Sequence, residues 1–502
     1  MFGCSNERNR MLVLVESRVW FYYCNMKKLI IILSAVFIIP FVVFAENQSI
    51  FGIDDNGFVY AGHDIVYQNL IDLEIPQYID GKEVTGIREK AFAGYKNIRS
   101  VTIPDSVVDI GPKAFYGCGN LESIDIPNGV VSIGSMAFCD CTSLKEVIVP
   151  FSVEEIGERA FCGCSNLENV LILGNIKEIE PYIFYWCLKL SSIFIPPSVT
   201  NIGEGAFSCC FRLEDVYIPN SVTYLGDMAF EHTRLESVYI PDSVEYIGNN
   251  IFRGCLNLKD ISVSEYNKRY ESIEGILLDK KKEELIRYPT AKEGAIYLVP
   301  NYINSIASSA FYGCSNIVYI EIGDNVSSIG SDAFRDCSKL RNIYVSDNNK
   351  NYKSVDGVLF DKKSGTLILY PSCKLETEYA VPNSVSVIGT LAFSSCSNLS
   401  EITIPDSVSI LKEGCFAGCS NLEKVIIPDS VTYIGLEAFY DCSKLERIYV
   451  PSSVEYIGET AFFFCSNLKE ICVDKEKDSI HGAPWCSSNV SVKWKGEFNS
   501  SV

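Results

Sequence analysis

One stretch, LESIDIPNGVVSIGSMA at residues 121–137, contains the pattern that determines the fold of this chain. Leu121, Ile124 and Ile126 give Leu-x-x-Ile-x-Ile, whose end alternates as in a half-buried strand. Pro127 ends that strand, because proline cannot donate a hydrogen bond to a neighbouring strand. The stretch therefore predicts a short strand that is buried on one face.

The second half of the stretch predicts a bend and a tight turn. A short extended piece ends at Gly134, where we expect a backbone conformation that other residues resist. The segment from Ser135 to Cys141 has room for about one helical or 3-10 turn. Small Ala137 permits close approach, and Phe138 fills the interior.

The same pattern recurs with a period of 23 residues, marked by an Ala-Phe pair. All steps between the key phenylalanines are 23 residues, except one of 22 and two of 59. A fixed period of this length indicates one supersecondary unit stacked many times, with a core that grows linearly. The key phenylalanines are Phe92, Phe115, Phe138, Phe161, Phe184, Phe207, Phe230, Phe252, Phe311, Phe334, Phe393, Phe416, Phe439 and Phe462.

The repeat Leu-x-x-Ile-x-Ile-Pro-x-x-Val-x-x-Ile-Gly-x-x-Ala-Phe-x-x-Cys resembles the 23-residue repeat of the BspA-like leucine-rich repeat family. Members of this family are bacterial and protozoan surface proteins. The match spans residues 69–473, which we interpret as the solenoid. The resemblance implies a right-handed superhelix with one long parallel β-sheet and short helical or 3-10 turns. It also implies adhesion or host contact as the function.

Both ends of the solenoid need a cover, because open strand edges pair with other chains. We expect residues 46–68 to form an N-terminal cap and residues 474–502 to form a C-terminal cap and tail. Trp485 and Trp494 are the expected plugs of the C-terminal cap.

The N-terminal region has the plan of a secretory signal. Residues 26–45 combine two lysines, an apolar run of about 16 residues and a Val-Phe-Ala cleavage site, and the run is shorter than the about 20 residues of a membrane span. Residues 1–25 do not fit this plan, so we expect translation to begin at Met26. The predicted location is secreted, cell-surface or periplasmic, with membrane attachment only if the signal segment stays uncleaved.

Composition and motifs argue against several classes of function. The net charge of −20 and the pI near 4.7 disfavour nucleic acid and anionic lipid, which bind clustered Lys and Arg. His63, His232 and His481 share no motif, and no nucleophile elbow, phosphate loop or paired metal motif occurs. We therefore expect no enzyme, no cofactor and no metal site.

Most repeats carry a cysteine three residues after the key phenylalanine. Equivalent positions in stacked repeats point the same way, so these thiols do not face one another as a disulfide requires. Zinc needs four ligands that converge on one point. We expect a buried thiol stack beside Phe115, Phe138 and Phe161. The ladder cysteines are Cys118, Cys141, Cys164, Cys187, Cys210, Cys255, Cys314, Cys337, Cys396, Cys419, Cys442 and Cys465.

Further cysteines lie outside this ladder. Cys139, Cys162 and Cys209 are either tolerated small residues or partly exposed thiols. Cys472 and Cys486 flank the end of the last repeat, and the sequence leaves open whether they form a disulfide.

The two 59-residue steps contain similar insertions, near residues 263–300 and 345–382. Each has two apolar stretches around a charged turn and ends in Tyr-Pro, which predicts a β-hairpin. The alternatives are a lateral binding ledge or a calcium turn at Asp279 or Asp361. Calcium takes six to eight oxygen ligands, and the segments supply too few.

The residue between the two isoleucines of each strand points away from the core. Along five consecutive repeats this residue is large and apolar or aromatic, which predicts an exposed strip about 20 Å long on the outer, concave sheet face. The alternative is that these residues only stabilise the sheet, since aromatic residues favour strands. The strip consists of Ile148, Leu171, Phe194, Tyr217 and Tyr239.

The sequence thus predicts an exported, monomeric protein that binds a protein or glycan surface ligand through this strip. The second hypothesis is a structural component of the cell envelope that assembles with itself. Catalysis has no support, because no site for it is apparent.

Overall fold

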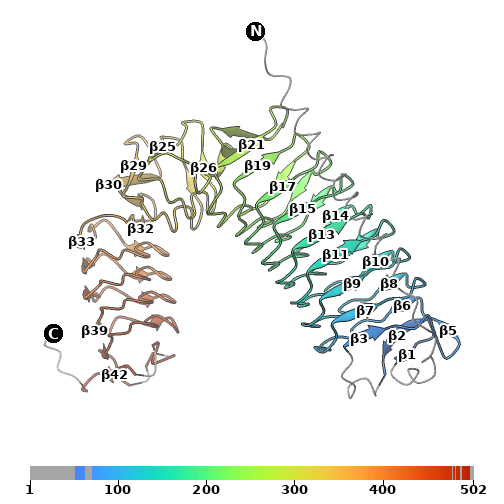
Figure 1. Cartoon of the computed structure of the whole chain (residues 1–502). Coiled ribbons are helices and arrows are strands. Elements are labelled where there is room, and N and C mark those ends of the chain that lie inside the picture. Colours follow the sequence, from blue (N-terminus) through green and yellow to red (C-terminus); the bar gives the residue numbers. More distant parts are fainter. Residues whose placement is uncertain (1–50, 63–70, 478, 481, 487–488, 498–502) are drawn as a thin grey trace, which may run out of the picture. The chain divides into compact units, whose positions relative to one another are not determined.

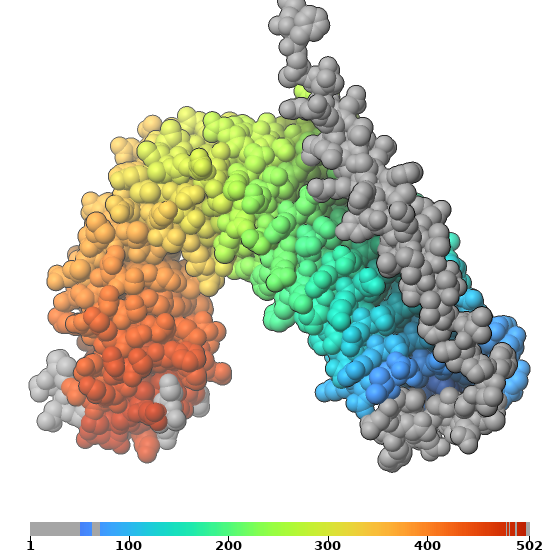
Figure 2. All heavy atoms as spheres, viewed as in Figure 1, coloured from blue at the N-terminus to red at the C-terminus, as the bar shows by residue number. Residues whose placement is uncertain are grey.

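The computed structural model describes residues 51–62, 71–477, 479–480, 482–486 and 489–497. The predicted signal segment, the residues before it and parts of both predicted caps lie outside these residues. Each repeat winds once around the core, and we call one such winding a coil. Successive coils lie side by side in the order of the sequence (Figure 1), and the space-filling view shows the same order (Figure 2).

Each standard coil contains two short strands, and each strand pairs in parallel with its counterpart in the neighbouring coil. In β9 (Ser123–Asp125), Ile124 is the register partner of Val101 in β7 (Ser100–Thr102). In β10 (Ser132–Ile133), Ile133 is the partner of Ile110 in β8 (Asp109–Ile110). The solenoid therefore has a second ladder of parallel strands beside the one formed by the Leu-x-x-Ile-x-Ile segments.

The first ladder contains the Leu-x-x-Ile-x-Ile strands and is interrupted into several short sheets. Its strands are β3 (Asp72–Glu74), β7, β9, β11 (Glu146–Val149), β13 (Asn169–Ile172), β15 (Ser192–Phe194), β17 (Asp215–Tyr217), β19 (Ser237–Ile240), β21 (Asp260–Val263), β25 (Ile296–Leu298), β27 (Tyr319–Ile322), β29 (Asn342–Val345), β33 (Glu378–Ala380), β35 (Glu401–Thr403), β37 (Lys424–Ile426), β39 (Arg447–Val450), β41 (Glu470–Val473) and β42 (Ser491–Trp494).

The second ladder contains mainly two-residue strands that end before the glycine of each repeat. Its strands are β2 (Phe58–Ala61), β6 (Gly86–Ile87), β8, β10, β12 (Glu155–Ile156), β14 (Glu178–Ile179), β16 (Asn201–Ile202), β18 (Tyr224–Leu225), β20 (Tyr246–Ile247), β24 (Glu284–Arg287), β26 (Ser305–Ile306), β28 (Ser328–Ile329), β32 (Thr366–Leu369), β34 (Val387–Ile388), β36 (Ile410–Leu411), β38 (Tyr433–Ile434) and β40 (Tyr456–Ile457). The other strands are β1 (Phe51–Ile53), β4 (Tyr78–Ile79), β5 (Lys82–Glu83), β22 (Tyr270–Ile273), β23 (Ile276–Asp279), β30 (Tyr352–Val355) and β31 (Val358–Asp361).

The segment around each key phenylalanine is a series of turns, and the described residues contain no helix. Around Phe115 the backbone is left-handed at Lys113 (φ 56°) and Gly117 (φ 70°). The N–H of Phe115 donates to the carbonyl of Ala137 in the next coil at 2.8 Å. Bonds between residues three apart, such as the N–H of Cys118 to the carbonyl of Phe115 at 3.1 Å, alternate with these bonds between coils, so the expected short turns are present as single turns.

Phenylalanine rings stacked along the solenoid form the centre of the core. The centroids of Phe92, Phe115, Phe138 and Phe161 follow one another at 5.4 Å, and all four side chains are fully buried. Each ring removes apolar surface from water only because a ring from the next coil covers it.

The reason given above for Gly134 is wrong. Gly134 is not among the residues with positive φ. Instead, a Cβ atom built on Gly134 would lie 2.5 Å from the backbone nitrogen of Pro112 in the preceding coil. A Cβ atom built on Gly157 would likewise lie 2.5 Å from the backbone nitrogen of Ser135. Glycine is needed here because two backbones approach closely, and not because of its conformational freedom.

The two 59-residue steps each contain a long coil with a hairpin, followed by a standard coil. In the first, β22 pairs antiparallel with β23 and β23 with β24, and β24 then joins the second ladder by pairing with β26. Tyr288 stacks on Phe311 at 5.3 Å, and Tyr370 stacks on Phe393 at 5.2 Å. A tyrosine therefore takes the place of the key phenylalanine in each long coil, which the search for phenylalanine alone missed.

Both ends of the solenoid carry additional structure. At the N-terminal end, Val59 in β2 is fully buried beside Ile87 of β6. At the C-terminal end, β42 pairs in parallel with β41, and the buried rings of Trp485 and Trp494 lie 6.1 Å apart.

Candidate binding surface

The structure places the predicted strip residues on one face of the first ladder, in five consecutive coils. Ile148 is the register partner of Leu171, and Phe194 is the partner of Tyr217. Tyr217 and Tyr239 are each 47% exposed and Ile148 is 38% exposed, whereas Leu171 and Phe194 are partly buried. The alternation in the sequence thus gives the correct side of the strand for all five residues.

Polar side chains line one side of this strip. The first residue of each strand is exposed and hydrophilic, as with Asn169, Ser192 and Asp215. Ion pairs connect neighbouring coils nearby, including Arg234 with Glu214 at 2.8 Å. An apolar centre with a polar edge is the usual arrangement of protein recognition surfaces.

The ladder cysteines are buried free thiols, and they do more than pack. The Sγ of Cys118 donates to the carbonyl of Phe92 at 3.1 Å, and Cys141 and Cys164 donate to Phe115 and Phe138, each at 3.2 Å. Each thiol thus bonds the key phenylalanine of the preceding coil. Where threonine replaces cysteine, Thr233 Oγ1 donates to the carbonyl of its own Phe230 at 2.9 Å. Sequence reasoning missed these bonds, because it considered only packing.

Burial raises the pKa of most of the ladder thiols. It raises the pKa of Cys118 to about 12 and likewise raises the pKa of Cys314 and Cys419 to about 12. The thiolate is the reactive form of cysteine, so these residues are chemically quiet in the folded protein.

The cysteines outside the ladder differ in exposure. Cys139 is buried, while Cys162 in the next coil and Cys209 are partly exposed. Cys472 and Cys486 are both buried and both free thiols, so the structure does not contain the disulfide considered for them.

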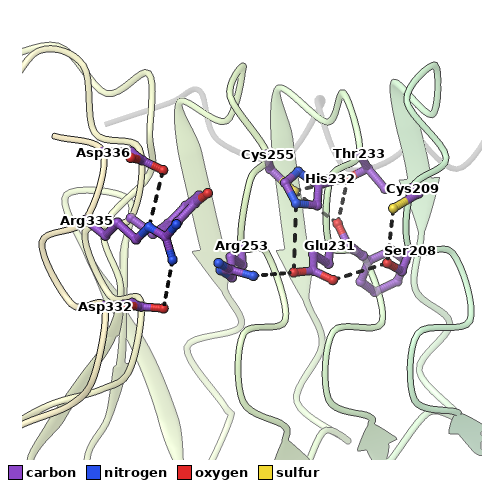
Figure 3. Close-up of polar contacts among 12 residues, drawn as sticks. Ser208, Cys209, Glu231, His232, Thr233, Arg253, Cys255, Asp332, Arg335 and Asp336 are labelled. Atoms are coloured by element: carbon purple, nitrogen blue, oxygen red, sulfur yellow. Dashed lines mark hydrogen bonds and ion pairs between the residues drawn. The ribbon is translucent and has the colours of Figure 1, made fainter. Parts of the chain in front are cut away.

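A polar cluster lies at the one shortened repeat (Figure 3) and was missed by sequence reasoning. Glu231, only 8% exposed, accepts hydrogen bonds from Arg253 at 3.1 Å and from Ser208 at 3.3 Å. The Nε2 of His232 lies 4.0 Å from the same carboxylate. Ser208 and His232 thus both face Glu231. His63 and His481 lie outside the described residues.

The hairpin aspartates use their oxygens within the protein. Asp279 accepts bonds from the N–H groups of Lys281 and Lys282 at 2.9 and 3.0 Å, and from Arg269 at 3.0 Å. Asp361 likewise accepts from the N–H groups two and three residues later. In the described part of the chain, no cluster of His, Cys, Asp or Glu is arranged to hold a metal ion.

The model of the BspA type leucine rich repeat region matches this chain in 6 copies, over residues 66–190, 177–274, 296–364 and 368–490. The chain belongs to the BspA-type leucine-rich repeat family. This family has a non-catalytic repeat fold. No curated protein matches the chain. No helix in the described part of this BspA-type protein is long and apolar enough to cross a membrane.

Solved structures with similarity to the chain include other leucine-rich repeat proteins. A leucine rich cell surface protein from Faecalibacterium prausnitzii is 27% identical with a TM-score of 0.48, covering 88% of this chain and 97% of its own. A leucine-rich repeat protein from Eubacterium ventriosum is 21% identical with a TM-score of 0.43, covering 78% and 92%. The pneumococcal vaccine antigen PcpA is 20% identical with a TM-score of 0.34, covering 89% and 98%. The family assignment rests on the repeat match alone.

Proposed function

We propose that this BspA-type protein is an exported binding protein that recognises a protein or glycan surface through the strip from Ile148 to Tyr239. The observation that carries this proposal is the alignment of five large apolar side chains on consecutive coils, three of them well exposed. Contiguous exposed apolar surface with a polar edge is more typical of an interaction site than scattered apolar residues are.

The strip differs from the other aromatic columns of this protein. On the second ladder, the rings of Tyr433 and Tyr456 stack at 4.9 Å, and those of Tyr224 and Tyr246 at 4.7 Å. Within the described residues, Phe194 and Tyr217 are register partners without such a ring contact. Tyr217 and Tyr239, each 47% exposed, can therefore contact a partner, and tyrosine suits this role with its apolar body and polar tip.

Replacing Phe194 and Tyr217 together by alanine is expected to weaken binding of the mature protein to its target surface at least tenfold. Neither side chain is fully buried, so we expect a change in free energy of unfolding of about 1 kcal/mol or less. Binding is measured on glycan arrays and on intact cells, and stability by urea denaturation.

The matched control is Tyr433→Ala with Tyr456→Ala, which removes two aromatic side chains from the second ladder. This control should retain binding. Equal binding by the strip variant and the wild type, or an equal loss in both variants, would exclude the strip as the site.

The mature protein is also expected to be a monomer in solution, in contrast to the self-assembly hypothesis. The last strand of the described residues, β42, carries Lys493, and Lys495 follows it. Charged lysines on an edge strand oppose pairing with a second copy. Size-exclusion chromatography with light scattering should give the mass of one chain, and a concentration-dependent ladder of larger masses would favour self-assembly instead.

A further inference from the structure

The two long coils are near copies of each other, separated by 82 residues in the sequence. Residues 263–289 read VSEYNKRYESIEGILLDKKKEELIRYP, and residues 345–371 read VSDNNKNYKSVDGVLFDKKSGTLILYP. The equivalence extends to the flanking coils, where Phe252 and Arg253 correspond to Phe334 and Arg335. Each long coil forms a junction with the standard coil before it and the one after it. The two junctions are thus a natural comparison within one chain.

At the first junction, large polar side chains occupy the space between the coils. Arg287 is 3% exposed and donates to the carbonyls of Ser309 at 2.6 Å and Tyr312 at 3.0 Å. It also donates to the hydroxyl of Thr290 at 2.7 Å. The guanidinium of Arg253 lies over the ring of Tyr312, 4.4 Å from its centroid.

At the second junction, the two largest of these side chains are missing. Leu369 stands at the position of Arg287, and Ser394 stands at the position of Tyr312. A cavity of about 390 Å³ lies here, and both Leu369 and Ser394 line it. Solvent reaches further inward as well, because Phe334 is 5% exposed whereas Phe252 is fully buried.

Arg335, the arginine next to the cavity, has different partners from its equivalent Arg253. Arg253 points toward Glu231 at the first junction, whereas Arg335 lies between Asp332 and Asp336 (Figure 3). The distances of 3.7 Å to Asp332 and 3.9 Å to Asp336 are longer than hydrogen bonds. This leaves Arg335 able to donate to another group at the cavity.

The lining combines hydroxyl, carboxylate and aromatic groups with aliphatic side chains such as Ile368 and Leu369. The cavity wall includes Asp332, Asp336 and Asp361 against Arg335 and Lys412, so its charges nearly balance. The hydroxyls come from serine and threonine residues such as Thr366, Thr390 and Ser394, and aromatic surface comes from Phe334, Tyr352 and Tyr370. Near-neutral charge disfavours a strongly charged ligand, while many short polar groups beside aromatic rings suit a neutral molecule with many hydroxyl groups.

One lining residue carries an unused polar group. Tyr370 is 1% exposed, and within the described part of the chain its hydroxyl has no hydrogen-bond partner. Burying a hydroxyl without a partner is costly, and this oxygen has almost no surface open to the cavity, so it marks loose packing at the second junction.

We propose that this cavity is a binding site for a mono- or disaccharide. Its volume of about 390 Å³ lies at the lower end of the range of about 300–1,000 Å³ for small-molecule sites. The carboxylates and Arg335 bind sugar hydroxyls, and the exposed edges of the largely buried aromatic rings contact apolar parts of the sugar. The proposal does not depend on the strip, because the strip residues lie on other coils, from Ile148 to Tyr239.

The test uses a variant that rebuilds the first junction at the second, L369R with S394Y. The carbonyls of Leu391 and Ser394 stand where Ser309 and Tyr312 accept from Arg287, so the new arginine has equivalent acceptors. Calorimetric titration is done with glucose, galactose, N-acetylglucosamine, maltose and lactose on the mature protein. We expect at least one sugar to bind the wild type and to lose at least tenfold in affinity with the filled variant.

Two further variants separate binding from folding. Tyr370→Phe keeps the cavity and removes a buried hydroxyl that makes no hydrogen bond, so it should leave sugar binding unchanged and should not lower the melting temperature. Arg287→Leu opens the first junction only. It should lower the melting temperature and leave the affinity of the second junction for the sugar unchanged.

Several outcomes would overturn the proposal. One is the absence of binding by every sugar at about 10 mM, where a site with a millimolar Kd is mostly occupied. Another is equal binding by the wild type and by a filled variant that melts like the wild type. A third is selective binding of free amino acids or dipeptides, run in the same format, in place of sugars.

Discussion

Raising the pH from about 8 to about 10 is expected to lower the free energy of unfolding of the mature protein on the order of 10 kcal/mol. An unfolded cysteine ionises near pH 8.5, whereas burial keeps the pKa of Cys118, Cys314 and Cys419 near 12. Below pH 8.5 both states hold the thiol proton, and the stability is fully present. Above it the unfolded chain releases protons that the folded chain retains, so stability falls until the folded pKa is reached.

The size of this effect follows from the number of stacked thiols. Each buried thiol with a raised pKa contributes a slope on the order of 1 kcal/mol per pH unit, and most coils of the ladder carry one. Tyrosines contribute only at higher pH, since an unfolded tyrosine ionises near pH 10. Urea denaturation at several pH values, with reductant present, measures the slope.

A matched variant distinguishes the thiols from other causes of alkaline unfolding. Cys141, Cys164 and Cys187 are changed together to threonine, the residue that naturally occupies the ladder at Thr233 and bonds the carbonyl of Phe230. Threonine does not ionise, so the slope above pH 8.5 should decrease by the share of three thiols. An unchanged slope would contradict the role of the thiol ladder.

The periodic sequence predicts the architecture because each repeat has the same local pattern of apolar and turn residues. The phenylalanine stack, with Phe115 and Phe138 at 5.4 Å, follows directly from the 23-residue spacing. The features that the sequence pattern does not predict depend on contacts between coils. The donation from Cys118 to Phe92 joins residues that are 26 apart, and Tyr288 is recognised as a core residue only by its stacking on Phe311.

The two candidate sites differ in the same way: the strip could be predicted from the sequence, whereas the cavity could not. Alternation within one strand identifies the outward side of residues such as Tyr217 and Tyr239, so the strip was predictable residue by residue. The cavity arises from Leu369 and Ser394, which are far apart in sequence and ordinary for their positions. The aligned sequences show that Leu369 replaces Arg287 and that Ser394 replaces Tyr312, and only the structure shows that these two positions meet at one cavity.

The glycines that follow the strands of the second ladder can be required for two reasons: close approach between two backbones, or an unusual backbone conformation. Substitutions at two glycines distinguish these reasons. Gly134→Ala places a Cβ 2.5 Å from the nitrogen of Pro112 and 2.7 Å from the carbonyl carbon of Gly111. Both are backbone atoms that cannot rotate away, so two coils must separate. We expect this variant to lower the free energy of unfolding by about 3 kcal/mol.

Gly117→Ala is the matched control, since Gly117 has positive φ (70°) and its Cβ would meet nothing closer than 3.9 Å. The equivalent position in other repeats holds Asp140 (φ 61°) and Trp186 (φ 62°), so the left-handed conformation tolerates side chains there. The control should cost about 1 kcal/mol. Urea denaturation compares the two variants. Equal losses would mean that conformational freedom, rather than the space between backbones, is what the repeat requires of its glycine.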